Sequence, residues 1–291
     1  MEIKKAIIPI AGLATRFLPL STVVPKELWP LVDRPVIQYI VEEAKNSGIS
    51  QIIFVVSPGK KDVLKYFQRF PQIEKILKER KKEKYLQELK RVEEVCRDLT
   101  FSFVVQKKPL GDGHALLQAR KLIQEDPVAA LWADDVVDSE IPCLLQLGKT
   151  FKTCQKPVVA LYRLPKERLS SYGIAGVEKI ANRFYKIKKI AEKPAPDQAP
   201  SDLAIVGKYI LTPEVFHYLK RAKISDSKRG EIILAEVLDK MIADGKMIYG
   251  YEFEGKWLEC GDKIGWLQSN LYLALKHADS GPKIKKYLKE I

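Results

Sequence analysis

Two basic residues follow a short apolar run near the N-terminus. The run ends with Ala11 and Gly12, and Arg16 lies in the polar turn beyond them. Lys26 comes ten residues after that arginine. Glycine lets peptide N–H groups approach an anion, a guanidinium can donate two parallel hydrogen bonds to phosphate, and lysine adds a point charge. The pattern indicates a triphosphate cradle, although neither G-x-x-x-x-G-K-[ST] nor G-x-G-x-x-G is present and an ordinary strand-to-loop turn is the alternative.

A second glycine-containing turn reads QKKPLGDGHA. Gln106 opens it, and Gly111 and Gly113 come just before an expected helix. The Gln106 side chain offers a donor and an acceptor on one planar amide, which can read the edge of a nucleobase. The two glycines permit close approach of a ligand. A solvent-exposed turn is the alternative.

Two adjacent aspartates end the buried run LWADDVVD. A carboxylate at the tip of a buried parallel strand is well placed to hold Mg²⁺, which binds carboxylates and substrate phosphates while keeping several waters. Asp134 is the leading candidate ligand, with Asp135 beside it. The alternative is that one of the pair caps a helix.

Two further stretches carry charged groups next to turns. Glu192 and Lys193 follow an alternating strand and precede a proline, so we expect their side chains to point out of the sheet in opposite directions. The carboxylate could accept hydrogen bonds from sugar hydroxyls, and the ammonium could meet a phosphate. A surface ion pair is the competing interpretation. Glu259 and Asp262 flank a glycine just before a helix, where a carboxylate would complete a metal site or cap the helix.

The elements that position these residues alternate between strands and helices in the first half of the chain. Such alternation predicts a mostly parallel sheet with helices on both faces, and ligands bind beyond the carboxyl ends of its strands. The second half reads mainly as successive strands with turns, followed by helices. We expect strands at residues 4–11, 51–56, 99–106, 128–132, 156–164, 173–179, 184–193, 204–212 and 247–255, and helices at 35–48, 62–70, 73–96, 114–123, 213–221, 230–245 and 264–278.

Length and composition limit the organisation. A chain of 291 residues with 46% hydrophobic residues can bury a substantial core, and we expect one continuous domain rather than two. Its nucleotide-binding half would span about residues 1–135, and its sugar-binding half with the C-terminal helices about 136–291. The fold class is α/β, with a Rossmann-like, mostly parallel but mixed sheet.

The charge balance points to an acidic ligand. Fifty Lys and Arg against 37 Asp and Glu give a net charge of +13, which suits nucleotides, sugar phosphates, nucleic acid or an anionic surface. In residues 73–96 glutamates interleave with lysines, which favours a solvated amphipathic helix over a nucleic-acid face.

Cysteine, histidine and hydropathy patterns narrow the class further. Four scattered cysteines and three distant histidines argue against a zinc cluster or a disulfide framework. No apolar run has membrane-spanning length, and the N-terminal run is too short for a signal peptide. We expect a cytoplasmic protein without a membrane or nucleic-acid partner.

In this order, the stretches resemble the sugar nucleotidyltransferases of the bacterial UTP–glucose-1-phosphate uridylyltransferase type. The resemblance covers nearly the whole chain, through KKAIIPIAGLATRFLP, PKELWPLVDRPVIQYIVEEA, GDGHAL, ADDVV, YGIAGV, EKPAPDQAPSDLAIVGKYILTPEVF and CGDKIGWLQ. It implies the nucleotide-diphospho-sugar transferase fold. It also implies a Mg²⁺-dependent reaction of UTP with glucose 1-phosphate that gives UDP-glucose and pyrophosphate, carried out by a homo-dimer or homo-tetramer.

The resemblance implies a role for each matched position. The catalytic residues would be Arg16 and Lys26 at the triphosphate and Lys193 at the sugar phosphate. The remaining positions are Ala11, Gly12, Gln106 and Gly111 for the nucleotide, Gly173, Glu192 and Gly207 for the sugar, and Asp134 and Glu259 for the metal.

The chain departs from the family pattern at several positions. Ala14 replaces a glycine, at a cost of roughly 1–2 kcal/mol if the backbone there is left-handed. Thr22 replaces a lysine, Asp112 adds a negative charge near the expected nucleotide, and Glu259 replaces a shorter aspartate. In the expected helix start EIILAE, Glu231 is kept and two polar positions have become apolar.

These changes leave other functions open. A weakly active or inactive paralogue that binds nucleotide sugar as a regulator is one. A pyrophosphorylase that uses another nucleotide or sugar 1-phosphate is a second. A Rossmann dehydrogenase is disfavoured by the missing third glycine and by Arg16 in the loop, and a nucleic-acid binder would require a salt-sensitive complex.

Overall fold

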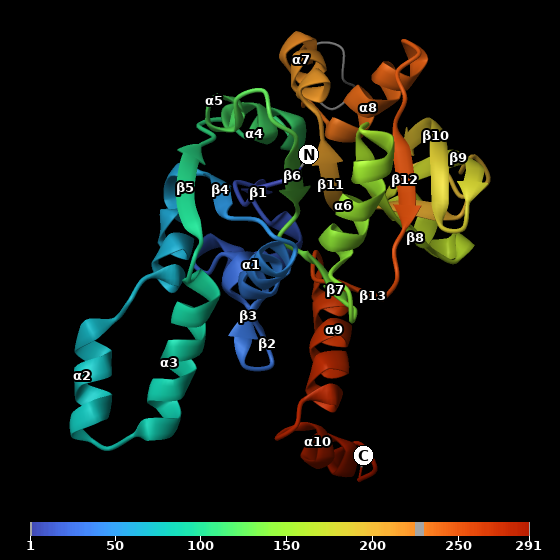
Figure 1. Ribbon diagram of the computed structural model, residues 1–291. Coiled ribbons are helices and arrows are strands. Elements are labelled where there is room, and N and C mark those ends of the chain that lie inside the picture. The colour runs from blue at the N-terminus through green and yellow to red at the C-terminus, as the bar shows by residue number, and fades with distance from the viewer. Residues whose placement is uncertain (1, 225–229, 291) are drawn as a thin grey trace.

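The computed structural model describes residues 2–224 and 230–290, and its centre is a nine-stranded sheet (Figure 1). In spatial order the strands of this sheet are β5 (Thr100–Val105), β4 (Gln51–Val56), β1 (Lys5–Pro9), β6 (Val128–Leu131), β11 (Leu203–Leu211), β8 (Val158–Arg163), β12 (Tyr249–Glu252), β10 (Phe184–Glu192) and β9 (Gly173–Ala181). Two small sheets accompany it, one of β13 (Lys256–Glu259) with β7 (Asp135–Asp138) and one of β2 (Pro30–Leu31) with β3 (Arg34–Pro35).

The sheet changes character along the chain. β5, β4, β1 and β6 are parallel, as expected for strands separated by helical crossovers. β11 runs antiparallel to both β6 and β8, and β10 is antiparallel to β9 and β12. Only two residues, Asn182 and Arg183, connect β9 to β10, and such a short connection can join only antiparallel strands. The mixed α/β fold class is confirmed, with the parallel part confined mainly to the first half.

Helices cover both faces of the sheet (Figure 1). The α-helices are α1 (Val36–Asn46), α2 (Pro71–Glu79), α3 (Glu83–Cys96), α4 (Asp112–Gln118), α5 (Arg120–Ile123), α6 (Cys143–Cys154), α7 (Pro213–Arg221), α8 (Leu234–Ala243), α9 (Lys263–Lys276) and α10 (Gly281–Tyr287). The 3-10 helices are η1 (Thr15–Phe17), η2 (Leu20–Thr22), η3 (Lys26–Leu28), η4 (Pro58–Phe67) and η5 (Lys166–Ser171).

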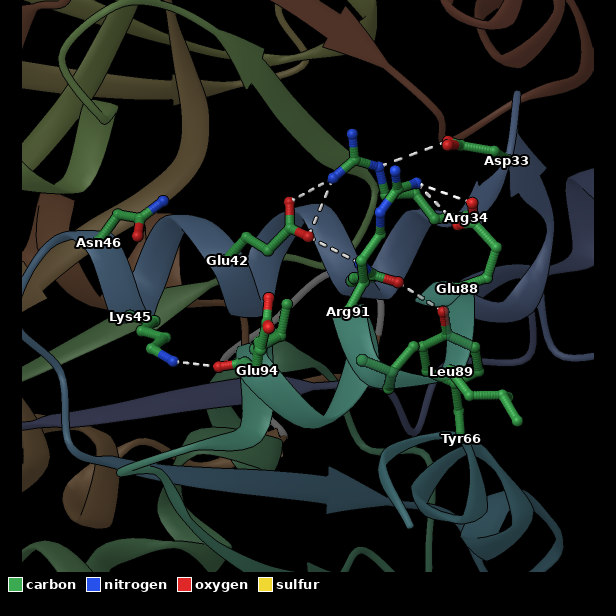
Figure 2. A pocket seen from close by; sticks show the side chains of 13 residues that line it. Asp33, Arg34, Glu42, Lys45, Asn46, Tyr66, Glu88, Leu89, Arg91 and Glu94 are labelled. Atoms are coloured by element: carbon green, nitrogen blue, oxygen red, sulfur yellow. Dashed lines mark hydrogen bonds and ion pairs between the residues drawn. The ribbon is translucent and has the colours of Figure 1, made fainter. Parts of the chain in front are cut away.

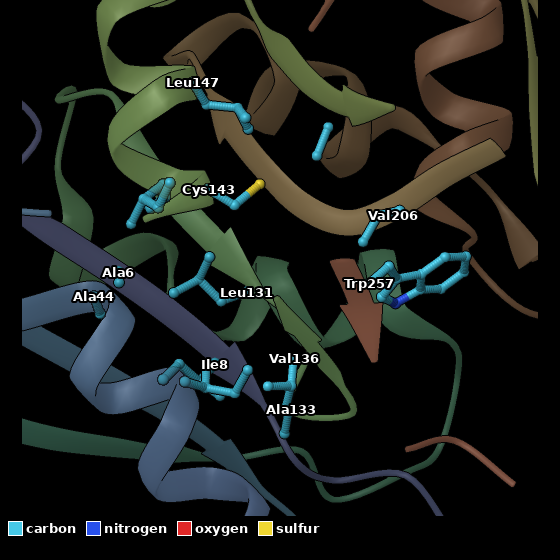
Figure 3. Close-up of a cluster of buried hydrophobic side chains, with 14 of the residues drawn as sticks. Ala6, Ile8, Ala44, Leu131, Ala133, Val136, Cys143, Leu147, Val206 and Trp257 are labelled. Carbon is cyan, nitrogen blue, oxygen red and sulfur yellow. The ribbon is translucent and has the colours of Figure 1, made fainter. Parts of the chain in front are cut away.

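Side-chain alternation along the strands divides the core into two layers. Ala6 and Ile8 of β1 belong to the layer covered by α1 and α6, whereas Ile7 belongs to the layer covered by α4, α7 and α8. Figure 3 shows the first layer, where Leu131 lies near residues of α1 and α6 and Trp257 of β13 lies at the far edge. Buried on both faces, these strands read as continuous apolar runs rather than alternating ones.

The predicted helix over residues 73–96 is wrong, because the chain forms two helices there. α2 ends at Glu79, and Lys81 adopts a left-handed backbone with φ 54° before α3 begins. The amide of Lys82 donates to the carbonyl of Leu77 at 2.9 Å, which closes the helix end. α2 and α3 form a hairpin at the side of the sheet (Figure 1). A glycine in the sequence usually indicates such a break between helices, but the residue at this position is Lys81, which does not predict one.

Three other predicted helices differ in their bounds or type. The helix expected over residues 230–245 begins only at Leu234, and the one expected over 62–70 is the 3-10 helix η4. The helix expected over 114–123 is divided into α4 and α5 at Ala119. In each case the apolar spacing predicted a helical region correctly. The start of α8 depends on a hydrogen bond from the amide of Leu234 to Asp112, which lies 122 residues away.

Candidate active site

The loop after β1 forms one wall of a cavity. β1 ends at Pro9, and Ala14 at the start of η1 has the left-handed angles φ 51° and ψ 44°. The loop thereby bends back over the carboxyl end of the sheet. Arg16 lies behind it, with Nη1 3.5 Å from the carbonyl oxygen of Gly261 in the loop before α9. A residue of the first loop and one of the loop before α9 therefore meet at the carboxyl end of the sheet.

The cavity has a volume of about 540 Å³ and lies beyond the carboxyl ends of β1 and β6. This is where an open parallel sheet binds ligands. The sequence-predicted residues that line it come from three connections, after β1, β5 and β6: Ala11, Gly12, Lys26, Gln106, Gly111 and Asp134. Six positions spread over 124 residues of sequence thus share one cavity.

Lys26 and Asp134 form the charged centre of the cavity. The lysine Nζ lies 2.5 Å from Asp134 Oδ2, and both side chains retain some exposure. Burial alone would lower the pKa of Lys26, but the charges of Asp134 and Glu27 raise it above its ordinary value. Burial would likewise raise the pKa of Asp134, but Lys26 and Arg16 lower it. Both groups are therefore charged at neutral pH.

A buried ion pair holds the short helix that carries Lys26. Glu27 is buried, and both of its carboxylate oxygens lie 3.3 Å from Nζ of Lys60 in η4. Lys60 is buried as well. Removing one member of such a pair leaves an uncompensated buried charge. The Pro-Lys-Glu motif therefore directs one side chain into the cavity and anchors the next to the element after β4.

Gln106 and Gly111 contact each other within the cavity wall. Gln106 Nε2 donates to the carbonyl oxygen of Gly111 at 3.0 Å. Gly111 has φ 99°, and a Cβ there would clash with the backbone of Ile232. The expectation that Gly111 and Gly113 leave space for a ligand needs correction, because the close approach at both is made by Ile232 of the segment before α8. Gly111 still borders the cavity.

Asp112 has a structural partner that the sequence did not reveal. Its Oδ1 accepts hydrogen bonds from the amide of Gly113 at 2.7 Å and from that of Leu234 at 2.9 Å. Leu234 is the first residue of α8, so Asp112 supplies the cap that the helix lacks locally. Burial raises the pKa of this carboxyl to about 6. The added carboxylate lines the cavity and also fixes α8.

The predicted sugar-binding residues lie on β9, β10 and β11. Gly173 pairs with Glu192 across β9 and β10, and a Cβ on the glycine would lie 3.2 Å from Glu192 Oε2. Lys193 follows with a left-handed φ of 49°, and its Nζ lies 3.8 Å from Glu192 Oε1. The expectation that the two side chains point in opposite directions is wrong, because the left-handed residue breaks the alternation of the strand. Gly173, Glu192 and Lys193 therefore form one cluster, which does not line the 540 Å³ cavity.

Gly207 lies between that cluster and the cavity. Its amide donates to Asp135 Oδ2 at 3.0 Å, and its carbonyl accepts from the amide of Trp132, a cavity residue, at 2.7 Å. A Cβ at Gly207 would clash with both of these side chains. Asp135 also accepts from Trp257 Nε1 at 2.8 Å. Neither aspartate caps a helix, because β7 begins at Asp135, so that alternative is wrong.

Glu259 is held by two side chains from the segment before β9. Arg168 Nη2 lies 2.8 Å from Glu259 Oε2, and the hydroxyl of Tyr172 donates to the same oxygen. Arg168 precedes Glu259 by 91 residues, which explains why no local pattern pointed to it. Asp262 caps α9 by accepting from the amides of Ile264 and Gly265, both at 2.9 Å. Its capping role, one of the two expected, is confirmed.

The donor set fits Mg²⁺ at Asp134. Mg²⁺ in nucleotide sites takes one or two carboxylates together with waters and substrate phosphates. Gly261 leaves room beside Asp134, because a Cβ there would lie 3.0 Å from Oδ2. Among the described residues no three acidic, histidine or cysteine side chains gather into a metal site. Oε2 of Glu259 is engaged by Arg168 and Tyr172, and the metal role of Glu259 stays a prediction.

A second cavity, of about 590 Å³, lies between α1 and α3 (Figure 2). Its charged groups neutralise one another. Arg34 is paired with Glu42 at 2.8 Å and Arg91 with Glu88 at 2.8 Å. Such pairs leave little net positive charge for a triphosphate. The cavity around Lys26 and Asp134, which carries the sequence motifs, is therefore the candidate active site.

The loop after β1 borders a cavity with a lysine and an aspartate at its centre, an arrangement that suits a protein that binds nucleotides. A sequence model described as Nucleotidyl transferase matches residues 5–274, and the chain belongs to that family. In the part of the chain that the structure describes, no helix is long and apolar enough to cross a membrane.

Curated relatives and solved structures show which nucleotidyltransferases the chain is similar to. The chain is 38% identical, over all its length and 99% of the relative, to the UTP–glucose-1-phosphate uridylyltransferase of Staphylococcus haemolyticus. It is 37% identical to that of Bacillus subtilis, over 94% of this chain and 92% of the relative. A UTP-bound UGPase from Acinetobacter baumannii matches with TM-score 0.89 and 34% identity, over 99% of both chains. A UDP-glucose pyrophosphorylase complexed with UDP-glucose matches with TM-score 0.85 and 34% identity, over 94% of this chain and 100% of that chain.

Proposed function

We propose that the protein is a UTP–glucose-1-phosphate uridylyltransferase, which forms UDP-glucose and pyrophosphate from UTP and glucose 1-phosphate. The observation that carries the proposal is the cavity in which the Gly12 loop, the Lys26–Asp134 pair and Gln106 meet. The similarity to relatives of that name over the full length supports it.

The reaction needs alignment and charge neutralisation rather than a nucleophilic side chain. The ionised phosphate of the sugar attacks the α-phosphorus of UTP, a new O–P bond forms, and the bond from that phosphorus to the β-phosphate oxygen breaks. The electron pair leaves with pyrophosphate. Arg16 and Lys26 stabilise the triphosphate and the departing pyrophosphate as negative charge grows there. No proton has to be removed from the attacking group.

Mg²⁺ bound at Asp134 would neutralise phosphate charge and orient the phosphates. In the site as described, Asp134 is paired with Lys26, so the lysine is already positioned beside any phosphate that binds there. Ala11 and Gly12 supply a wall that a nucleotide can approach closely, and Gly111 borders the same cavity. The proposed nucleotide-binding half over about residues 1–135 supplies every residue that lines this cavity except Glu231.

The second substrate is assigned to the cluster on β9 and β10. Glu192 would accept hydrogen bonds from sugar hydroxyls, and Gly173 and Gly207 would line the sugar site. The ammonium of Lys193 would meet the sugar phosphate. The nine-stranded sheet, continuous across both halves, supports the proposal of a single domain over residues 1–291. We also retain the proposals of a cytoplasmic enzyme and a homo-oligomer.

The first measurement is pyrophosphate release by the purified protein with Mg²⁺ and glucose 1-phosphate, with UTP, dTTP, CTP, ATP and GTP tested separately. Rapid release with UTP is expected. Release with another nucleotide alone would identify a pyrophosphorylase of different specificity. If no nucleotide gives release but UDP-glucose still binds in calorimetry, the protein is instead a regulatory paralogue. The observation that favours this alternative is the ion pair of Arg168 with Glu259, the predicted second metal ligand.

Replacement of Lys193 tests the sugar-phosphate role. The side chain of Lys193 is 37% exposed, and its ion pair with Glu192 is long, at 3.8 Å. The Lys193→Ala variant should therefore fold normally. Loss of a positioned charge at the reacting phosphate should lower kcat/KM by about a hundredfold. Lys188→Ala, in which another exposed β10 lysine is removed, is the matched control and should keep full activity. Near-wild-type turnover of the Lys193 variant would contradict the assignment.

A further inference from the structure

The amide of Gln106 is held by two acceptors. Its Nε2 lies 3.0 Å from the carbonyl oxygen of Gly111 and 2.9 Å from Nδ1 of His114 in α4. The other ring nitrogen of His114 lies 3.1 Å from the side-chain amide of Gln118, one turn further along the helix. Gln106 is 5% exposed and borders the nucleotide cavity.

The carbonyl of Gly111 decides which end of the Gln106 amide points away from the cavity. A carbonyl oxygen can only accept, so the group beside it must be the NH₂ of Gln106. That NH₂ group also faces His114 Nδ1, which must then be an acceptor without a proton. A neutral imidazole with an unprotonated Nδ1 carries its proton on Nε2. His114 Nε2 therefore donates, and the Gln118 amide must turn its oxygen toward it. That turn gives up the 3.3 Å contact of Gln118 Nε2 with the carbonyl oxygen of His114, which is longer than the 3.0 Å contact that orients Gln106.

The position of Gly111 is itself fixed by the segment before α8. Ile232 donates from its amide to the carbonyl of Leu110 at 2.8 Å and accepts from the amide of Gly113 at 2.9 Å. These bonds enclose Gly111 on both sides and hold its carbonyl toward Gln106. The acceptor that orients the Gln106 amide is thus part of a paired backbone rather than a free loop.

The remaining polar atom of Gln106 is Oε1. Within the described part of the chain this oxygen has no donor, while the side chain lines the cavity. An acceptor in that position suits a base whose edge carries a ring N–H. Uracil and thymine carry a proton on N3, whereas the N3 of cytosine is an acceptor and would face the oxygen unfavourably.

We infer that His114 is a positioning residue that fixes the orientation of the Gln106 amide and thereby selects bases with an N3 proton over cytosine. The inference rests on the proposed function, because it assigns the base-reading step of that same site. His114 does not contact the reacting phosphates. It acts through Gln106, as the second of two acceptors for the amide NH₂ group.

The test compares nucleotide preference among three variants. His114→Leu removes the acceptor, and the ratio of kcat/KM for UTP to that for CTP should fall about fivefold, as expected for loss of one neutral hydrogen bond. His114→Asn places a side-chain oxygen near the Nδ1 position and should restore most of the ratio. His217→Leu, at an exposed histidine of α7, is the control and should match the wild type. An unchanged ratio in a folded His114→Leu variant overturns the inference.

A second measurement decides the inference without any turnover. The chain has three histidines, so ¹⁵N–¹H spectra of the histidine rings can be assigned by comparison with His114→Asn. The inference requires a neutral ring with its proton on Nε2. A proton on Nδ1 overturns it even if the enzyme makes UDP-glucose. If no nucleotide reacts or binds, the proposed function fails, whereas the ring tautomer still reports on the orientation of Gln106.

Discussion

At the scale of single residues, several side chains of the site have two roles. Lys26 faces the cavity while its neighbour Glu27 holds η3 to Lys60. Asp112 borders the cavity while it caps α8. Ala14 is different, because its distinguishing feature is a left-handed backbone, with φ 51° and ψ 44°. The sequence left open whether this position needs glycine angles or merely a small side chain, and the structure shows that it has glycine angles.

Replacement of Ala14 by glycine should stabilise the protein. The left-handed backbone costs an L-residue about 1–2 kcal/mol, and the greater freedom of glycine in the unfolded chain offsets about 0.4–1 kcal/mol of the gain. Urea unfolding of Ala14→Gly should therefore show an increase of roughly 0.5–1 kcal/mol in the free energy of unfolding. Ala222→Gly, at φ −61°, is the matched control and should lose stability. Equal destabilisation of both variants would contradict the strain at Ala14.

At the scale of elements, one helix begins where a residue far away in the sequence caps it, and another begins at a local cap. α8 starts at Leu234 because Asp112 accepts its first amide, and α9 starts where Asp262 accepts two amides of its own first turn. The first cap joins α4 to α8 and so encloses Gly111 and Ile232 between them. A change in the charge of Asp112 should therefore affect the stability of this junction.

The pKa of Asp112 predicts a pH-dependent effect of Asp112→Asn. Burial raises this pKa from an ordinary value of 3.8 to about 6, so the folded protein binds a proton there more tightly than the unfolded chain. The contribution of this group to stability is complete below pH 4 and is lost as pH rises through about 6. The asparagine variant keeps an acceptor for Leu234 without a charge.

Thermal unfolding at two pH values tests this expectation. Asp112→Asn should equal the wild type at pH 4. At pH 8 it should be more stable by about 1–2 kcal/mol, because the wild-type carboxylate is then charged in a partly buried position and the asparagine is not. The difference between variant and wild type isolates Asp112 from other titrating groups, such as Asp135, whose pKa burial and the charge of Asp134 raise to about 7. A variant less stable at pH 8 would contradict the assignment.

At the scale of the whole molecule, one sheet joins the two halves. Some of the helices around this sheet carry apolar side chains that are exposed on the surface. On α9, Ile264, Leu267 and Leu271 recur at helical spacing and are exposed. The α2–α3 hairpin stands beside the sheet with exposed Ile73 and Ile76 (Figure 1). Exposed apolar surface of this kind marks interaction sites in many proteins. The resemblance to a family of dimers and tetramers gives the predicted homo-oligomer, with these helices as candidate interfaces.

Light scattering tests the oligomer and one of its candidate surfaces. The wild type should have two or four times the mass of one chain. Ile264→Glu, at a position 63% exposed, should lower that mass, because a charge would be buried unpaired in an apolar contact. Ile180→Glu, at a position 50% exposed on β9, should leave it unchanged. A wild type with the mass of one chain would contradict the predicted homo-oligomer. An Ile264→Glu variant with the same mass as the wild type would exclude α9 from the interface.

The sequence by itself determined the alternation of strands and helices, the mixed α/β class and the loops that carry the chemistry. Local apolar periodicity reports these features, because burial on one or both faces is encoded within a few residues. It also determined the order of motifs from which the family resemblance follows. It could not show that a lysine at position 81 would divide the helix over residues 73–96, because residues of ordinary helix propensity give no local sign of a left-handed turn.

The tertiary structure decided which groups meet. Arg16 contacts Gly261 across 245 residues, and Asp112 caps Leu234 across 122. Arg168 holds Glu259 across 91 residues, which a metal-ligand pattern alone did not suggest. Hydrogen bonds of such separation depend on how the sheet and its helices pack, and packing is a property of the whole chain. The sequence therefore determined the residue types available for the reaction, whereas the fold determined their partners.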